Sequence, residues 1–330
     1  MPSVRSSVGD SNNSRSGECG EECSDEAGRM FLLTGYTHLQ HVSSSATHET
    51  FVGLSEYTKE LVQIRVYALE QLRRYPLLRD RVERGVLVAR TVNHPNIVQG
   101  LPAFVSESDL FVVEEHCVGG ELFATLDAYY RSLASATPTH SKSDVPCKQA
   151  FECLSLNFVR RIMRDLMGAV HYLHTTCGVV HRGIKLESIF LDDDNHAKLG
   201  RLGTCAAIPA RDEGEGMLQL CCASRHYAAP ELVMGWPYKG ELVDVWAAGV
   251  VLFVMLTGRF PFEEGDGDED MLFTRICTAD EVLLAHPALA LVPDPLAIDL
   301  VRNMLRLNPD SRLTVVEVQK HPFLLTVPAS

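Results

Sequence analysis

The stretch that decides the fold of this 330-residue chain runs from Val180 to Gly203. It reads Val180-His181-Arg182-Gly183-Ile184-Lys185-Leu186-Glu187-Ser188-Ile189-Phe190-Leu191, then a polar turn, then Lys198-Leu199-Gly200-Arg201-Leu202-Gly203. The turn, Asp192-Asp193-Asp194-Asn195, has residue types that favour a reversal of the chain. The apolar residues on either side therefore predict two short strands that pair around it.

This stretch resembles the catalytic loop and the metal-binding loop of protein kinases, which that family writes as H-R-D-L-K-x-x-N and D-F-G. The family's frame is retained at His181, Arg182 and Lys185. The positions that carry chemistry have changed: Gly183 replaces the base, Ser188 the metal-binding asparagine and Arg201 the metal-binding aspartate. The resemblance therefore implies a kinase fold with no intact catalytic residue and no metal site.

The resemblance covers about residues 36–325, where several motifs follow in the family's order. It implies an α+β fold with two lobes: a small lobe with an antiparallel sheet and one helix, and a large, mainly helical lobe. We expect a kinase-like domain over 31–325, with a small lobe at about 31–115, a large lobe at about 119–325, an inserted loop at about 130–154 and a tail at 326–330. Residues 1–30 carry almost no large apolar side chains, so a disordered tail is predicted there.

Composition limits the class of protein and its partners. Hydrophobic residues make up 46% of the chain and charged residues 22%, which is typical of a soluble globular protein. The net charge of −13 argues against nucleic acid and anionic membranes as partners. The ten cysteines form no C-x-x-C pairs, so reduced thiols and a cytoplasmic location are expected, with the nucleus also open. The apolar run 242–256 contains Asp244 and is too short to span a bilayer, so it predicts a buried helix.

The small lobe has lost the family's phosphate-binding features. Residues 36–66 read as three strands, and kinases place a glycine-rich loop between the first two, because glycine lets backbone N–H groups approach the phosphates. The three glycine positions are occupied by Ser43, Ser45 and His48. In the next strand, Arg65 stands at the position of the phosphate-binding lysine, and Gln63 at that of a small alanine beside the adenine.

Residues 67–91 read as the helix that carries the lysine's partner glutamate in kinases. Counting back from the His94–Val98 motif, H-P-N-I-V, puts Gly85 at the glutamate position. Glycine weakens a helix interior by about 1 kcal/mol relative to alanine. The neighbouring Glu83 faces another side of the helix, so the usual ion pair is not expected.

Residues 111–122 resemble the hinge between the lobes and contain the G-G-E-L sequence common in calcium/calmodulin-dependent-type kinases. This register puts Glu114 at the gatekeeper position, which is usually apolar. Glu121 keeps an acid that in relatives faces ribose or a basic substrate residue, although a solvated acid at a helix start is equally open. The resemblance gives these candidates for a nucleotide pocket: Val42, Gln63, Arg65, Glu114, Glu115, Cys117, Glu121, Lys185, Phe190 and Arg201.

Positions that serve the architecture of the large lobe are retained: His181, Arg182, Glu231, Asp244 and Arg312. In kinases the residue at Asp244 caps the backbone of the catalytic loop, and the arginine at 312 pairs with the anchor glutamate at 231. Both ends of that bridge are present here, so the resemblance predicts it.

Two acidic segments have no fixed role in the sequence. Asp212, Glu213 and Glu215 lie where kinases carry a phosphorylation site; they either pair with Arg182 in place of a phosphate or remain solvated. Six of the eight residues in 263–270 are acidic, which is typical of a solvated loop and is also compatible with a basic partner surface.

The charges of the cleft leave its ligand open. Arg65, Lys185 and Arg201 could bind ATP weakly without magnesium, or another polyanion. The lost glycines, the larger Gln63 and the aromatic Phe190 argue against nucleotide binding, and no cofactor is expected. We hypothesise that Glu114 pairs with Arg65 or Arg201 and closes the pocket, because an isolated buried carboxylate is costly.

The contrast between a retained scaffold and lost chemistry predicts a pseudokinase. Such a protein acts by binding a protein partner, for example an active kinase or its substrate, as a scaffold or allosteric regulator. The first alternative is an atypical ATP-dependent serine/threonine kinase, in which Glu187 or one of the acids at 192–194 would have to serve. The second alternative is a sensor of a nucleotide or polyanion.

Overall fold

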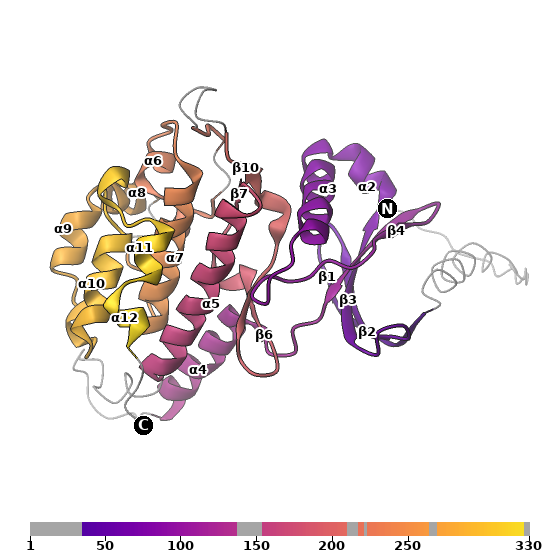
Figure 1. Ribbon diagram of the computed structural model, residues 1–330, viewed down its shortest axis with the longest axis horizontal. Coiled ribbons are helices and arrows are strands. Elements are labelled where there is room, and N and C mark those ends of the chain that lie inside the picture. Colours follow the sequence, from indigo (N-terminus) through magenta and orange to yellow (C-terminus); the bar gives the residue numbers. More distant parts are fainter. Residues whose placement is uncertain (1–34, 137–153, 210–216, 221–222, 264–268, 327–330) are drawn as a thin grey trace, which may run out of the picture.

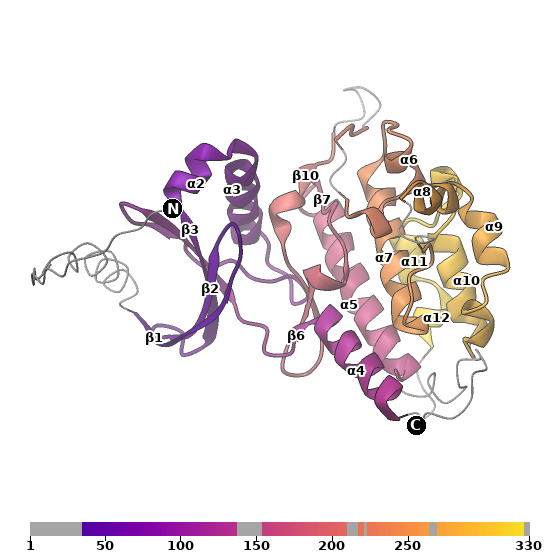
Figure 2. The same cartoon turned by 180° about the vertical axis from the view of Figure 1, so that it is seen from behind.

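Two lobes lie side by side in the computed structural model, which describes residues 35–136, 154–209, 217–220, 223–263 and 269–326 (Figure 1). The smaller lobe is built on a sheet, and the larger one is mainly helical; Figure 2 shows the same arrangement from behind. The expected bilobal α+β fold is confirmed. The predicted N-terminal tail, residues 327–330 of the predicted C-terminal tail and most of the predicted insert lie outside the described residues.

An antiparallel sheet with strand order β1-β2-β3-β5-β4 forms the small lobe. Its strands are β1 (Tyr36–Ser44), β2 (Glu49–Ser55), β3 (Leu61–Ala68), β4 (Phe104–Val105) and β5 (Asp109–Glu115). Because side chains alternate along a strand, β3 buries Val62, Ile64 and Val66 in an apolar cluster with β5. The same alternation places Gln63 and Arg65 on the opposite face of the sheet.

Two consecutive helices, α2 (Leu69–Arg74) and α3 (Pro76–Thr91), replace the single helix expected over 67–91. The break falls at Tyr75, because a residue before proline is pushed out of the helical region and Pro76 is suited to a first helical position. Tyr67 and Ala68 belong to the end of β3. The small lobe therefore has two helices among its described residues.

The large lobe is arranged around α7 (Gly240–Thr257), whose residues are nearly all buried. The helix α7 is long and apolar enough to cross a membrane, but 89% of it is buried inside the protein. The sequence prediction of a buried helix over 242–256 is thereby confirmed.

Helices and short strands surround α7. The helices are α4 (Leu122–Ala136), α5 (Leu156–Thr175), α6 (Pro230–Val233), α8 (Glu269–Cys277), α9 (Ala279–Leu284), α10 (Pro295–Met304), α11 (Val315–Gln319) and α12 (Pro322–Leu325). The strands are β6 (Gly120–Glu121), β7 (Val179–Val180), β8 (Ile189–Leu191), β9 (Ala197–Leu199) and β10 (Ala206–Ala207). The pair β8–β9 closes around residues 192–195 as predicted.

One boundary prediction was wrong. We expected the inserted loop to begin at about residue 130, but α4 continues to Ala136. Tyr130 packs closely on Gly258, where an added Cβ would lie 2.6 Å from the tyrosine ring, and this contact holds the helix against the end of α7. The rest of the expected loop, 137–153, lies outside the described residues.

Arg312 and Glu231 form the buried bridge that the sequence suggested. Arg312 Nη1 and Nη2 donate to the two carboxylate oxygens of Glu231 at 2.8 and 3.1 Å. Arg312 also donates to the main-chain carbonyl oxygens of Leu242 and Arg306. Both side chains are almost completely shielded from solvent, so neither charge has water as a substitute partner.

Replacing Arg312 with alanine is expected to lower the free energy of unfolding by about 3–5 kcal/mol, because it leaves the Glu231 carboxylate buried without a counter-ion. Urea unfolding followed by circular dichroism measures the loss. The matched control is Lys239→Ala, which removes a surface pair with Asp310 at 3.0 Å and should cost less than about 1 kcal/mol. Equal losses in the two variants would contradict this account.

Candidate functional site: the cleft between the lobes

A cavity of about 400 Å³ lies between the lobes, at the position where kinases bind nucleotide. Nine of the ten predicted pocket residues line it: Val42, Gln63, Arg65, Glu114, Glu115, Cys117, Glu121, Phe190 and Arg201. Ser43, Ser45 and His48, the residues at the glycine positions, also line it, as do Thr50 and Val98. The cavity is thus built from the β1–β2 turn, β3, the hinge and the β8–β9 region.

Lys185 was predicted to line the pocket, and this prediction was wrong. It is not among the residues of the cavity wall, and its Nζ lies 4.0 Å from Glu187 Oε1. In the same turn, Ser188 Oγ accepts from the Lys185 N–H and donates to the Lys185 carbonyl. The cationic character of the cleft therefore comes from two arginines rather than three basic residues.

Arg65 and Glu114 form an ion pair inside the cleft. The residues lie on adjacent antiparallel strands, with Arg65 opposite Val112 and Glu114 opposite Gln63, so their side chains are diagonal neighbours on one face. Their side chains are only 19% and 14% exposed. The carboxylate of Glu114, at the gatekeeper position, thus pairs with the guanidinium of Arg65, at the phosphate-binding position. This is one of the two pairings that the hypothesis of a closed pocket predicts.

The environment of Arg65 keeps it positively charged. Burial disfavours the charge, but the carboxylate of Glu114 and the hydroxyl of Tyr67 outweigh it and raise the pKa of Arg65 above its usual value. The nearby His48 behaves in the opposite way: burial, and then the charges of Arg65 and Arg201, lower its pKa. His48 is therefore a neutral side chain at physiological pH, and it adds no charge to the cleft.

Arg201 occupies the position where kinases hold magnesium. Its guanidinium forms an ion pair with Glu121 and donates from Nε to the Glu187 carbonyl oxygen at 2.7 Å. It also lies over the ring of Phe190, 5.9 Å from the centroid. The acid of the G-G-E-L sequence is therefore paired with a cation of the same chain.

The third carboxylate of the cleft is paired as well. Glu115 lies 3.0 Å from Lys198 Nζ, and its other carboxylate oxygen accepts the Gln99 N–H at 2.7 Å. The acids that line the cavity are thus each matched by a basic residue of the chain. Lys198 was not anticipated from the sequence, because nothing in its spacing places it beside the hinge.

Gly183 and Ser188 stand at the positions of the base and of the second metal ligand, and both are enclosed by neighbouring groups of the chain. An added Cβ at Gly183 would lie 2.5 Å from Thr204 Oγ1, so Thr204 occupies the space of the missing side chain. The Thr204 hydroxyl is buried and has no hydrogen-bond partner within the described residues. Ser188 is fully buried, and its hydroxyl is used by Lys185. Neither position offers an oxygen that points freely into the cleft.

Gly85 of α3 packs directly against the segment that follows Arg201. An added Cβ would lie 3.3 Å from the Gly203 nitrogen, and a Cβ on Gly203 would lie 2.7 Å from the Arg81 carbonyl oxygen. Glu83 is on the surface, 3.8 Å from Arg79. Arg65 therefore pairs with Glu114 and not with Glu83 of α3. This agrees with the expected loss of the ion pair between the strand cation and a helix glutamate.

The catalytic-loop frame is intact around these changes. Asp244 accepts the backbone N–H groups of His181 and Arg182, both at 2.7 Å. Burial lowers the pKa of His181, whose ring bonds the Gly200 carbonyl and the Gly183 N–H. Arg182 Nε donates to the Thr204 carbonyl at 2.9 Å.

The acids suggested as partners of Arg182, 212, 213 and 215, lie outside the described residues, as does 264–268 of the acidic run.

No group of three or more His, Cys, Asp or Glu residues among the described residues is arranged to hold a metal ion. The cleft thiol, Cys117, is buried, and burial raises its pKa to about 12, so it stays protonated.

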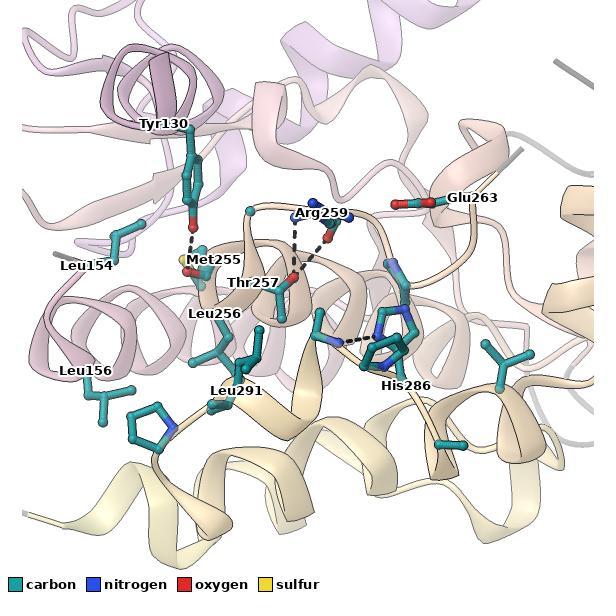
Figure 3. A pocket seen from close by; sticks show the side chains of 18 of the residues that line it. Tyr130, Leu154, Leu156, Met255, Leu256, Thr257, Arg259, Glu263, His286 and Leu291 are labelled. Atoms are coloured by element: carbon teal, nitrogen blue, oxygen red, sulfur yellow. Dashed lines mark hydrogen bonds between the residues drawn. The ribbon is translucent and has the colours of Figure 1, made fainter. Parts of the chain in front are cut away.

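A larger cavity, of about 580 Å³, lies within the large lobe, and no predicted site residue lines it. Figure 3 shows that Tyr130 from α4 points towards Met255 at the end of α7, with its hydroxyl 3.4 Å from the Met255 carbonyl oxygen. His286 and Leu291 close another side (Figure 3). The walls are mostly apolar, and Leu154, at the border of the undescribed segment 137–153, forms part of the rim.

Comparison with known proteins agrees with this geometry. The protein kinase domain family model matches residues 52–324, so the chain belongs to the protein kinase family. It is 32% identical over 249 residues to serine/threonine-protein kinase GIN4 of Saccharomyces cerevisiae, covering 75% of this chain and 19% of that protein. It is 29% identical over 301 residues to CBL-interacting serine/threonine-protein kinase 5 of Arabidopsis thaliana, covering 91% of this chain and 60% of that protein. The chain thus spans between a fifth and three fifths of the length of these relatives.

A double-mutant cycle on Arg65→Gln and Glu114→Gln tests the ion pair in the cleft. Each single change leaves a poorly hydrated charge unpaired, so a favourable coupling energy of about 1–3 kcal/mol is expected from unfolding midpoints. The control cycle uses Lys185→Gln and Glu187→Gln, whose charges are 4.0 Å apart and about one-third exposed. That cycle should give less than about 1 kcal/mol. Indistinguishable couplings would show that Arg65 and Glu114 do not pair in solution.

Proposed function

We propose that this protein is a pseudokinase that acts by binding another signalling protein and does not transfer phosphate. The observation that carries the proposal is the state of the two arginines in the cleft. Arg65 and Arg201 stand at the positions of the phosphate lysine and the metal aspartate, and both are paired with this chain's own carboxylates, Glu114 and Glu121.

The chemistry of phosphoryl transfer explains why this arrangement is inactive. The reaction needs magnesium on the phosphates, a lysine to hold them and an aspartate to orient the acceptor hydroxyl. Magnesium prefers carboxylate and carbonyl oxygens, and Arg201 places a permanent cation at its site. Loss of a general base alone typically lowers a rate by about 10²–10⁴-fold. Loss of the metal also removes the main electrostatic stabilisation of the transition state.

An atypical serine/threonine kinase is the second candidate, because the relatives named above are serine/threonine kinases. It would require Glu187 or an acid of 192–194 to replace the missing residues. None of these lines the cleft, and Asp192 Oδ1 accepts the N–H groups of Asp194 and His196 within its own turn. A polyanion sensor is the third reading, and the pairing of both arginines argues against it.

The partner that we propose is a protein, such as an active kinase or its substrate, in the cytoplasm or the nucleus. The retained large lobe supports this role, because the bonds of Asp244 and the bridge between Arg312 and Glu231 maintain a kinase-like surface without a working site. The excess of acidic residues is unfavourable for binding nucleic acid or anionic lipid.

A phosphotransfer assay on the purified chain tests the main proposal. With radioactive ATP and either Mg²⁺ or Mn²⁺, labelling of a mixed peptide library should stay at the blank, at least about 10⁴-fold below the roughly 1–100 s⁻¹ of ordinary kinases. A parallel preparation of Arg65→Ala identifies label from a contaminating enzyme, because such label is equal in both. Transfer that is present in the wild type and abolished in Arg65→Ala would contradict the proposal.

Thermal unfolding with nucleotide tests whether the chain's own carboxylates close the cleft. Millimolar ATP, with or without Mg²⁺, should leave the wild-type midpoint unchanged. In Glu114→Gln/Glu121→Gln both guanidinium groups are released, so ATP without metal should raise the midpoint by about 2–4 °C.

The control for this experiment is Asp193→Asn/Asp194→Asn, which makes the same change in net charge at exposed positions outside the cavity. It should show no shift. A clear shift of the wild type with micromolar ATP would rule out occlusion.

A further inference from the structure

The cavity in the large lobe has the size and the walls of a binding site for a small molecule. Its volume of about 580 Å³ falls within the range of about 300–1,000 Å³ that is typical of ligand pockets. It is separate from the cleft between the lobes, since no residue lines both. Three parts of the lobe supply aliphatic side chains to its wall, namely the start of α5, the end of α7 and the chain before α10: Leu154, Leu156, Met255, Leu256, Leu291 and Val292.

The side-chain hydroxyl groups of this wall are already engaged by the protein itself. The Tyr130 hydroxyl lies 3.4 Å from the Met255 carbonyl oxygen, and the Thr257 hydroxyl donates to a main-chain carbonyl of α7 at 2.8 Å. Three further residues of the wall are prolines, which have no backbone N–H to donate: Pro261, Pro287 and Pro293. A peptide backbone buried here would lose its hydrogen bonds to water, so we expect the main body of a ligand to be hydrocarbon.

The charged side chains of the cavity gather on one side of it. Figure 3 shows Arg259, Glu263 and His286 on the side away from Leu154. Burial lowers the pKa of His286, the charge of Glu263 raises it, and the charges of Arg259 and Arg275 lower it further. Arg275 therefore belongs to the same group, and the cavity is divided into an apolar part and a charged part.

The charged part has donors to spare. Within the described parts of the chain, neither Arg259 nor Arg275 forms an ion pair. His286 Nδ1 accepts the Ala288 N–H at 3.2 Å, so the neutral ring carries its proton on Nε2, for which the described residues supply no acceptor. Glu263 is the only acid among the residues of the wall, so one positive charge is in excess. A single anionic group at the end of a ligand would complement this arrangement.

We propose that this cavity binds a free long-chain carboxylate, that is, a fatty acid. The carboxylate pairs with Arg259 and Arg275 and accepts a hydrogen bond from His286, and the alkyl chain lies against Leu156 and Leu256. Guanidinium groups suit this role because their paired N–H groups match the two oxygens of a carboxylate. An acyl chain joined to another protein as an amide lacks this negative charge, so the site favours the free acid. This inference concerns a cavity away from the cleft and does not depend on whether the protein transfers phosphate.

Isothermal titration calorimetry of the full-length chain with decanoate, dodecanoate and tetradecanoate, each below its micellar concentration, tests the site. One acid should bind per chain, and each added methylene should strengthen binding about fourfold until the apolar part is filled. Methyl dodecanoate has the same chain without the charge, and it should bind at least about tenfold more weakly than dodecanoate. Equal binding of the acid and the ester would overturn the proposal.

Two arginine variants test the recognition of the head group. Arg259→Gln/Arg275→Gln should weaken the binding of dodecanoate by at least about tenfold and leave that of the ester unchanged. The matched control is Arg131→Gln, at an exposed arginine of α4 outside the cavity wall, which should change neither.

A pair of neighbouring substitutions locates the ligand. Ala285 lines the cavity and Leu284 does not, and both are exposed, so a tryptophan at either position should leave the unfolding midpoint unchanged. Ala285→Trp fills the cavity and should abolish the binding of dodecanoate, whereas Leu284→Trp should not affect it. If the tryptophan at 285 disturbs the fold, the arginine variants decide. Several acids bound per chain, binding that persists in the arginine variants, or no binding of any of the three acids would overturn the proposal.

Discussion

The buried carboxylate of Asp244 fixes the loop on which the rest of the large lobe depends. It accepts two backbone N–H groups, from His181 and Arg182, and it lies 2.9 Å from the ring of His174. These bonds hold Arg182 in a left-handed conformation, with φ of 59°, which a non-glycine residue adopts only when its surroundings impose it. Because the donors are backbone groups, the geometry does not require an aspartate at position 183. The loop can therefore keep its shape with glycine at that position.

The ion pairs of the cleft next to this loop differ from those of an ordinary kinase. In an ordinary kinase the cation of β3 pairs with a helix acid and the cleft holds a metal. Here the cation of β3 pairs with Glu114 on the neighbouring strand, and a guanidinium at position 201 pairs with Glu121. An unpaired Arg65 or Glu114 would be an isolated charge in a poorly hydrated place, which is unfavourable, whereas the side chains of Arg201 and Glu121 are 42% and 32% exposed. Taken together they compensate one another, so the cleft remains electrostatically balanced without ligand.

Much of this architecture was predictable from the sequence, because the retained residues serve packing and follow simple rules of spacing. The strand pair around 192–195, the buried α7 and the contact between Arg312 and Glu231 were all expected. The pairing of Glu114 was predicted only as a choice between Arg65 and Arg201, since a sequence gives positions on a strand but not the reach of a long side chain. The diagonal register of β3 and β5 decides that choice.

Other features depend on contacts between distant segments and had no sequence signal. Lys185 lies outside the cavity wall, and its amine is 4.0 Å from the Glu187 carboxylate. Lys198 lies on β9, and the fold brings its amine within 3.0 Å of Glu115 in the hinge. Thr204 was visible as a hydroxyl next to Gly203, but its place in the space above Gly183 follows only from the path of the chain. The break between α2 and α3 had a signal in Pro76, which the apolar pattern of the helix obscured.

The contact between Gly85 and Gly203 has a mechanical consequence. Side chains between two packed elements can change rotamer and absorb small displacements, but here the main chains meet with almost nothing between them. A push of a few tenths of an ångström on α3 must therefore be transmitted to residues 202–204, which belong to the other lobe. A displacement of α3 would therefore act directly on the backbone of the large lobe at this contact.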